Sequence, residues 1–311
     1  MIKAPFPIAL TKQALDIAKS HRQAFAAGER PISLQLLLDE MADGGAIAVN
    51  SLRSPRNAVA LGWQFSPRIL MWALAGRPIV YLVWGLPARG LVRDALMKLL
   101  LRSANLILVN DAASADEVRQ FCERDATNVP YLVDTAYYNQ ASLKAREDFL
   151  FCPSSNDRDG EILLALAKSG FPVIWMNNDR DLITHYRDAH ANLQIVTRPS
   201  FAELRRLYQT CRACILPLKA DIHAAGQTTA LEALACGAPV ILSRGRTSSI
   251  FEADGLVQVV DGAEVDQWLA ALASLPAQDE LDRRCKLVGE KHSPDAVAGT
   301  IISQLSHVSG M

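Results

Sequence analysis

The chain has 311 residues, about twice the usual length of one domain, so we expect two domains that each bury a core of their own. Half of the residues are hydrophobic, 21% are charged and the formal net charge is −1, which argues against a disordered chain and against a uniformly basic nucleic-acid-binding protein. Residues 1–147 hold 17 basic and 13 acidic residues and residues 148–311 hold 15 and 20, so the halves carry +4 and −5 and are expected to face different partners.

The first half alternates short apolar runs with helical stretches, although the pattern is irregular. The expected strands are 46–49, 79–83, 106–110 and 130–133. The expected helices are 8–26, 32–42, 67–75, 90–103 and 115–124. Two of them have recognisable starts: Ser66 and Pro67 are typical of an N-cap and a first helical residue, and Ser114 with Glu117 forms a capping-box pattern.

The second half is more regular. The expected strands, apolar on both faces, are 149–152, 172–176, 193–196, 213–217, 239–243 and 256–260. Helices are expected between them at 161–169, 201–211 and 228–236, with a final helix from Ser293-Pro294 to about residue 306. Ser200 and Glu203 form a capping box before the second of these, and Gly237 with Pro239 ends the third.

This alternation predicts an α/β protein with doubly wound, Rossmann-like sheets, whose ligands bind at the carboxyl ends of the strands. We expect an N-terminal domain over residues 1–147 and a nucleotide-binding domain over residues 148–292. The charged stretch 144–149 is the expected linker, and the C-terminal helix 293–311 is expected to pack back toward the N-terminal domain.

The sequence favours a cytoplasmic protein. Its first ten residues lack the continuous apolar core of a signal peptide, and its longest apolar stretch, residues 69–86, is interrupted by Gly76, Arg77 and Pro78. The six cysteines do not form a disulfide framework. Cys211 and Cys214 make a lone C-x-x-C without the second ligand pair of a zinc site, so buried, reduced thiols are expected.

The run GQTTALEALACGAPVILS, residues 226–243, carries the clearest chemical pattern. Gly226 allows a ligand to approach the backbone, and Gln227, Thr228 and Thr229 form the first turn of a helix, where free N–H groups bind phosphate. Glu232, one turn further along, is placed to accept hydrogen bonds from the hydroxyls of a ribose. The alternative is that Glu232 is a solvated helix residue and that the glycines only cap helices.

The same run resembles the donor-site signature of retaining GT-B-fold glycosyltransferases, the glycosyltransferase family 4 group. In that family a glycine-rich turn leads into a helix of the form EAMACG-PVI, and this chain has LEALACGAPVI at 231–241. Weaker matches in the same order are 77–87, 103–121, 131–139 and 201–218. The resemblance implies a GT-B fold, in which two Rossmann-like domains face a cleft, with an abbreviated N-terminal domain because residues 1–76 match poorly.

Residue by residue, the resemblance implies that Glu232 binds the nucleotide ribose and that the backbone at Thr228 and Thr229 binds the diphosphate. It places Thr197, Arg198 and Pro199 near the base. It also implies a nucleotide-sugar donor, a saccharide or lipid-linked acceptor, retention of configuration, no cofactor and no obligatory metal.

The chain departs from the family pattern on the sugar side of the site. The family has a second glutamate eight residues before the position of Glu232, and here that position is Ala224. His223 and Asp221 stand close by and can take over contacts to the transferred sugar, although loop residues of these types are commonly just solvated. A histidine of the acceptor domain is replaced by Trp84, which cannot act as a base but can stack on a sugar.

A further departure concerns the cations that neutralise the diphosphate. The expected lysine position holds Asp159, which leaves Arg158 or Lys219 as substitutes. Without such a partner, the diphosphate would lose charge-assisted hydrogen bonds of about 1.5–3 kcal/mol each.

The helix around Arg89–Arg102 is basic and apolar at once. Arg89, Arg93, Lys98 and Arg102 flank a leucine-rich run, which suits peripheral docking on anionic lipid at the inner face of a membrane. The alternative, which the sequence favours, is an amphipathic core helix with a solvated polar face.

The sequence thus predicts a glycosyltransferase that moves a sugar from a nucleoside diphosphate donor to an acceptor. The alternative is a non-catalytic binding or scaffold protein of a glycan-assembly system that keeps the GT-B fold. A dehydrogenase on the same kind of sheet is disfavoured because no G-x-G-x-x-G follows a strand.

Overall fold

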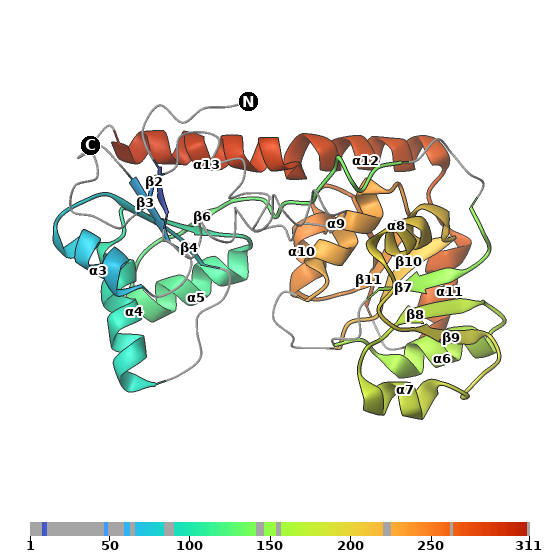
Figure 1. Ribbon diagram of the computed structural model, residues 1–311. Coiled ribbons are helices and arrows are strands. Elements are labelled where there is room, and N and C mark those ends of the chain that lie inside the picture. The colour runs from blue at the N-terminus through green and yellow to red at the C-terminus, as the bar shows by residue number, and fades with distance from the viewer. Residues whose placement is uncertain are drawn as a thin grey trace. The chain divides into compact units, whose positions relative to one another are not determined.

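The computed structural model describes residues 8–10, 47–48, 59–62, 66–83, 90–140, 146–153, 157–219, 225–261 and 264–309. The chain forms two compact units, the first from residues 1–132 with 293–311 and the second from residues 133–292. Within the described residues each unit has one sheet of six strands, and all the strand pairs are parallel (Figure 1).

The first sheet has the strand order β2-β1-β3-β4-β5-β6. Its strands are β1 (Ile8–Leu10), β2 (Ile47–Ala48), β3 (Val59–Gly62), β4 (Ile79–Val83), β5 (Leu106–Val109) and β6 (Thr127–Asn128). The order of the first five strands, 2-1-3-4-5, is one of the two common doubly wound arrangements, and β6 extends the sheet at the β5 edge.

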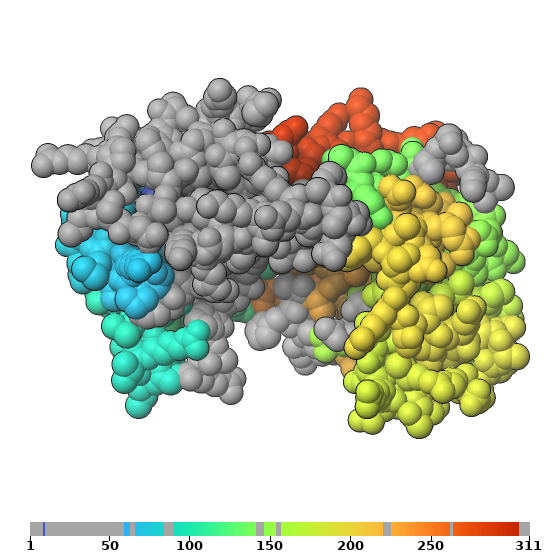
Figure 2. Space-filling model, in the orientation of Figure 1, coloured from blue at the N-terminus to red at the C-terminus, as the bar shows by residue number. Residues whose placement is uncertain are grey.

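Three helices cover one face of this sheet. They are α3 (Pro67–Leu74), α4 (Leu91–Ser103) and α5 (Ala112–Cys122), and they join one core with alternate residues of β4, Ile79, Tyr81 and Val83. The outer sides of α3 and α4 reach the surface (Figure 2). The unit also includes α13 (Pro294–Ser309).

The second sheet has the strand order β12-β11-β10-β7-β8-β9. Its strands are β7 (Leu150–Cys152), β8 (Val173–Met176), β9 (Leu193–Val196), β10 (Ala213–Leu216), β11 (Val240–Ser243) and β12 (Gln258–Val260). Counted along the chain this is the Rossmann order 3-2-1-4-5-6, in which the order reverses between β7 and β10. In such sheets ligands bind outside the carboxyl ends of the strands at the point of reversal.

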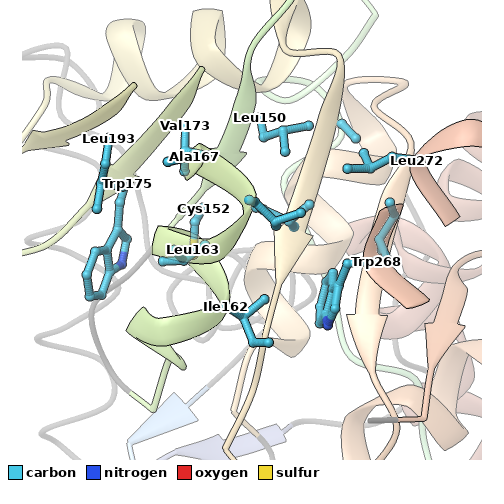
Figure 3. Close-up of a cluster of buried hydrophobic side chains, with 14 of the residues drawn as sticks. Leu150, Cys152, Ile162, Leu163, Ala167, Val173, Trp175, Leu193, Trp268 and Leu272 are labelled. Atoms are coloured by element: carbon cyan, nitrogen blue, oxygen red, sulfur yellow. The ribbon is translucent and has the colours of Figure 1, made fainter. Parts of the chain in front are cut away.

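Helices pack on both faces of the second sheet. They are α6 (Gly160–Lys168), α7 (Arg180–Tyr186), α8 (Phe201–Thr210), α9 (Gln227–Ala235), α10 (Arg246–Glu252), α11 (Val265–Ala273) and α12 (Gln278–His292). On one face, α6 and α11 enclose an apolar core that includes Leu163, Trp175 and Trp268 (Figure 3). On the other face, Tyr208 of α8 packs edge-on against Phe151 of β7, with ring centroids 5.3 Å apart.

The strands expected in the second half are confirmed, as are the helices expected there and the capping box of Ser200 and Glu203. In the first half, several strands and helices differ from the expected ones. Residues 8–10 form a strand rather than the start of a helix, because they pair with both β2 and β3 and their central residue, Ala9, is fully buried. Strand β3 was not expected, and the expected strand at 130–133 is replaced by β6 just before it.

The caps of the first-unit helices also differ in detail. Ser66 is the N-cap of α3 and Pro67 its first residue, as expected, but the Ser66 side chain makes no capping hydrogen bond. Helix α5 is capped by Asp111, which accepts a hydrogen bond from the Ser114 backbone at 2.8 Å, so the expected capping box at Ser114 is wrong. The expected helix at 32–42 lies outside the described residues.

Residues just before the expected domain boundary are bonded into the second unit. The Val133 N–H donates to the carbonyl of His292 at 2.8 Å, and Arg146 donates to the carbonyls of Cys211 and Gly237. These contacts agree with a second unit that begins at residue 133, and they show that Arg146, within the stretch expected to be a linker, is bonded to the C-terminal ends of α8 and α9 in that unit.

Candidate functional site

The loops that follow β7 and β10 meet at the point where the strand order of the second sheet reverses. The Asp159 N–H donates to the Pro217 carbonyl at 2.7 Å, and the Lys219 N–H donates to the Asp157 carbonyl at 3.0 Å. An antiparallel bridge joins Arg158 to Leu218 between these two bonds. Arg158 and Lys219 lie 61 positions apart in the sequence. The topology brings both to the carboxyl ends of the central strands β7 and β10.

Helix α9 begins at these strand ends. Its N-cap, Gly226, has φ 86°, a left-handed conformation in which a side chain would be strained. The Thr229 hydroxyl donates back to the Gly226 carbonyl at 2.9 Å, which fixes the first turn. The first N–H groups of a helix have no partner within it, so the start of α9 presents donors and the positive end of the helix dipole.

Arg158 supplies a cation at the start of α9. Its side chain is buried, with a residue exposure of 2%, and its Nη2 donates to the Thr229 hydroxyl at 3.4 Å. A Cβ built on Gly226 would lie 3.6 Å from the same Nη2 atom, so the guanidinium stands beside the helix start. The positive charge and the helix dipole add at this point, which is the electrostatic setting of an anion site.

Asp159, at the position where the family pattern has a lysine, has a structural task. Its carboxylate caps α6 by accepting hydrogen bonds from the backbones of Glu161 and Ile162 at 3.0 and 3.4 Å. The neighbouring Arg158 is the residue that reaches the start of α9, whereas the Lys219 side chain is exposed.

Gln227, the first residue of α9, has a buried side chain with 1% of the residue exposed. Among the described residues, neither the nitrogen nor the oxygen of its amide has a hydrogen-bond partner. Leaving a buried polar group without a partner costs about 1–3 kcal/mol.

Glu232 lies further along α9 and is also buried, so the alternative of a solvated helix residue is wrong. The Tyr208 hydroxyl donates to its Oε2 atom at 2.9 Å. Burial, and then the nearby carboxylate of Glu232, raise the pKa of Tyr208 well above its usual value, so the phenol stays protonated as a donor. A carboxylate has about four lone-pair positions and can accept several hydrogen bonds at once.

A hydrogen bond from backbone to side chain joins the loops after β8 and β9. The Arg198 N–H donates to the Asn178 side chain at 3.0 Å, and Arg198 has a left-handed φ of 45°. Thr197 and Arg198 are exposed. Asn177, at the end of β8, is fully buried, and its Nδ2 atom has no hydrogen-bond partner.

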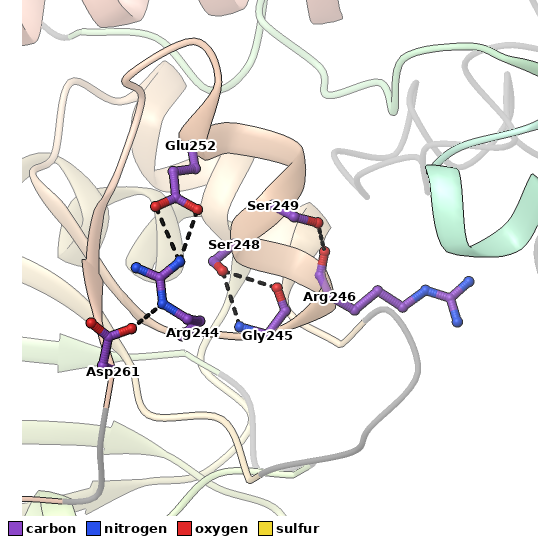
Figure 4. Close-up of polar contacts among 7 residues, drawn as sticks. All are labelled: Arg244, Gly245, Arg246, Ser248, Ser249, Glu252 and Asp261. Atoms are coloured by element: carbon purple, nitrogen blue, oxygen red, sulfur yellow. Dashed lines mark hydrogen bonds and ion pairs between the residues drawn. The ribbon is translucent and has the colours of Figure 1, made fainter.

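The end of β11 and the first turn of α10 support the loops of the site, a role that the sequence did not predict. The Thr247 hydroxyl donates to the carbonyl of Ala225 at 2.7 Å, and the Leu218 N–H donates to the Ser243 hydroxyl at 3.0 Å. In the loop between them, Arg244 bonds to Glu252 and Asp261 (Figure 4). The signal that could have found it is the run of small polar residues, SRGRTSS, directly after a buried strand.

Other expected site residues lie outside the described part of the chain. These are Trp84, Asp221, His223 and Ala224. The expected site residues that the structure describes are Gly226, Gln227, Thr228, Thr229, Glu232, Arg158, Lys219, Thr197 and Arg198.

Two Asp-x-Asp runs, at 157–159 and 179–181, have the carboxylate spacing that can hold Mg²⁺. In each run one carboxylate caps a helix: Asp159 caps α6, and Asp179 caps α7. The described residues contain no group of three or more His, Cys, Asp or Glu side chains that could hold a metal ion. The Cys211 and Cys214 thiols are free and buried, as expected.

A cavity of about 330 Å³ lies in the second unit at the amino-terminal ends of the strands, opposite to the carboxyl ends where Arg158 lies. Its lining includes Asp148, Arg212 and Pro239, which directly precede the strand regions of β7, β10 and β11. Because ligands of doubly wound sheets bind at the carboxyl ends of the strands, the strand topology favours the edge at Arg158 over this cavity.

Solved structures match most of the chain in fold. AviGT4, a glycosyltransferase involved in avilamycin A biosynthesis, is 18% identical over 81% of this chain and 98% of its own, with a TM-score of 0.51. A sucrose-phosphate synthase from Thermosynechococcus elongatus is 14% identical over 97% of this chain and 99% of its own, with a TM-score of 0.61. The fold is that of the GT-B glycosyltransferases.

TarM also matches, with a TM-score of 0.60 and 11% identity over 80% of this chain and 54% of its own. No protein-family model and no curated protein sequence matches the chain. Among the helices of the described residues, none has the length and apolar character needed to cross a membrane.

Proposed function

We propose that this protein is a glycosyltransferase that moves a sugar from a nucleoside diphosphate donor to a saccharide or lipid-linked acceptor. One observation carries the proposal: the buried cation Arg158 reaches the first turn of α9, where the strand order reverses and the first N–H groups of the helix have no partner within it. The GT-B fold supports it, because AviGT4, which this chain resembles in fold, is a glycosyltransferase.

The donor would lie along the carboxyl edge of the second sheet. Its diphosphate would accept hydrogen bonds from the backbones of Thr228 and Thr229 and from Arg158. Glu232, held by Tyr208, would accept from the ribose hydroxyls, and the base would lie near Thr197 and Arg198. This arrangement requires no metal ion, because protein groups neutralise the diphosphate.

The chemical step would be stabilised electrostatically. As the bond between the anomeric carbon and the phosphate oxygen breaks, negative charge develops on the leaving diphosphate, next to Arg158 and the start of α9. The acceptor hydroxyl would attack from the same face of the sugar and pass its proton to the leaving phosphate, with retention of configuration.

Donor binding can be tested by thermal melting with UDP, GDP and ADP. A nucleotide present at 100 times its dissociation constant stabilises the folded state by about 2.7 kcal/mol. Arg158→Gln should abolish most of this gain, because the diphosphate loses a charge-assisted bond of about 1.5–3 kcal/mol. Arg212→Gln is the matched control, since Arg212 pairs with Asp148 at the other edge of the sheet.

No stabilisation of the native protein by any nucleoside diphosphate would contradict the proposal, as would equal stabilisation of both variants. Turnover is measured separately, with sugar conjugates of the nucleotide that binds. Nucleotide binding without hydrolysis or transfer would instead favour the non-catalytic binding or scaffold protein.

A further inference from the structure

Apolar side chains are concentrated on the outer surface of two neighbouring helices in the first unit. The large hydrophobic residues that are exposed in the described chain are Met71, Leu74, Leu91, Val92, Leu99 and Phe201. The first five belong to α3 and α4 and together form what we call the α3–α4 surface. Phe201 is in the second unit.

The outward face of α4 is apolar rather than polar. Met97, Leu100 and Leu101 are buried, whereas Leu91 and Val92 are 93% and 75% exposed. At 100° per residue, Leu91, Val92, Ala95 and Leu99 fall on one stripe opposite the buried residues. An ordinary core helix has polar residues on that side, so α4 differs from the solvated face that the sequence favours.

Helix α3 repeats this arrangement. Its buried residues are Ile69 and Trp72, and the outward Met71 and Leu74 are 61% and 68% exposed. Because the buried sides of α3 and α4 join the same core on one face of the sheet, their outward sides look away from that face together. Both helices reach the surface on one side of the unit (Figure 2).

The charge of these helices is positive. They carry Arg68, Arg93, Lys98 and Arg102 against a single acidic residue, Asp94. Lys98 and Arg102 pair with Glu123 at 3.7 and 2.8 Å but keep 38% and 45% of their side chains exposed. An apolar surface with a basic excess is complementary to an anionic lipid interface, whereas a symmetric dimer would bring two basic surfaces together.

We propose that the α3–α4 surface docks on an anionic membrane. Leu91, Val92 and Met71 would enter the boundary between headgroups and acyl chains, and the basic side chains would contact lipid phosphates. The attachment is peripheral and reversible, because the apolar area is confined to two short helices. It is independent of donor chemistry in the second unit.

The test is flotation of the full chain with vesicles made of phosphatidylcholine and phosphatidylglycerol in equal parts, compared with phosphatidylcholine alone. The native protein should float with the anionic vesicles, and less so at high salt. The double variant Leu91→Asp and Val92→Asp should bind about tenfold more weakly or worse. Phe201→Asp is the matched control and should bind like the native protein, because it changes an exposed apolar residue of the other unit.

Circular dichroism melts establish that each variant folds, which is expected because the altered side chains face solvent. Equal binding of the native and double-variant proteins, or no binding of the native protein to anionic vesicles, would overturn the proposal. The proposal would also be overturned if the native protein were a dimer that did not float with the vesicles and if the double variant were a monomer. Nucleotide melts on the same samples separate this outcome from a failure of the glycosyltransferase proposal.

Discussion

At the scale of single residues, Tyr208 fixes the position of Glu232 from a neighbouring helix. Its hydroxyl donates to the carboxylate at 2.9 Å, and both groups are buried. In Tyr208→Phe the ring is kept but the carboxylate loses this donor, so we expect a loss of about 1–3 kcal/mol in the free energy of unfolding. Urea unfolding measures it, and under the proposed function the stabilisation by nucleotide falls as well.

Tyr137→Phe is the control for this substitution. The Tyr137 ring stacks edge-on against Tyr138 and under Arg205, and both contacts survive the loss of the hydroxyl. We expect a change within about 0.5 kcal/mol, as for ordinary surface substitutions. If both variants proved equally stable, the hydrogen bond between Tyr208 and Glu232 would not contribute the expected free energy of unfolding.

The buried thiols give the folded state a pH dependence at alkaline pH. Burial raises the pKa of Cys152 and of Cys211 to about 12, whereas a thiol in the unfolded chain ionises near about 8.5. Above that pH the unfolded chain loses protons that the folded chain keeps, so stability falls as the pH rises toward the folded-state pKa. Each thiol contributes a slope of up to about 1.4 kcal/mol per pH unit.

Removing one of these thiols should make the alkaline loss of stability shallower. Cys211→Ala creates a small cavity, which lowers stability at every pH, but it also removes one thiol from the titration. Urea unfolding under reducing conditions, repeated at several pH values above about 9, gives the slope. An unchanged slope would show that Cys211 ionises alike in the folded and unfolded states.

At the scale of elements, replacing either of two glycines of the second unit by alanine should change the stability in opposite directions. A Cβ on Gly160, at the start of α6, would come within 2.6 Å of the Tyr186 ring, which is itself packed against Trp175 and bonded to Glu161. Gly160→Ala should therefore cost about 1–3 kcal/mol through overpacking. Gly289, inside α12, has open space around it, so Gly289→Ala should stabilise by about 0.5–1 kcal/mol.

Thermal and urea unfolding of the two alanine variants provide the comparison, since each serves as the other's control for the same change. The prediction depends on their opposite signs. Two variants that both destabilise would mean that α12 tolerates no added methyl group, and two neutral variants would mean that Tyr186 moves aside freely.

The elements that the sequence could predict are those whose own residues carry a recognisable pattern. The second-unit strands are apolar on both faces and bounded by glycine, proline or polar residues, so each was recognisable by itself. Strand β1 has three residues and β2 has two, and such short segments have no measurable period. They are strands because Ala9 pairs with both Ile47 and Ala60, a long-range fact that local sequence does not contain.

The candidate site also has one part that the sequence could predict and another that it could not. The start of α9 was predictable because a helix N-terminus after glycine has a local signature. That Arg158 reaches Thr229, across 71 positions, depends on the path of its side chain, and that Tyr208 reaches Glu232 depends on how α8 packs beside α9. Pairings of this kind follow from the strand order, which becomes known only with the structure.

At the scale of the whole molecule, the two proposals assign donor binding to the second unit and membrane docking to the first, and hydrogen exchange can test this division. A nucleoside diphosphate should slow exchange at the start of α9 and in residues 157–159, which the proposed donor site includes. Anionic vesicles should slow exchange in α3 and α4 instead, because only the first unit carries the α3–α4 surface. The expected result is two sets of protected peptides that do not overlap, measured by mass spectrometry on the full chain with each ligand alone. Protection of α3 and α4 by the nucleotide, or of α9 by the vesicles, would contradict this division, because it would mean that either ligand acts on both units.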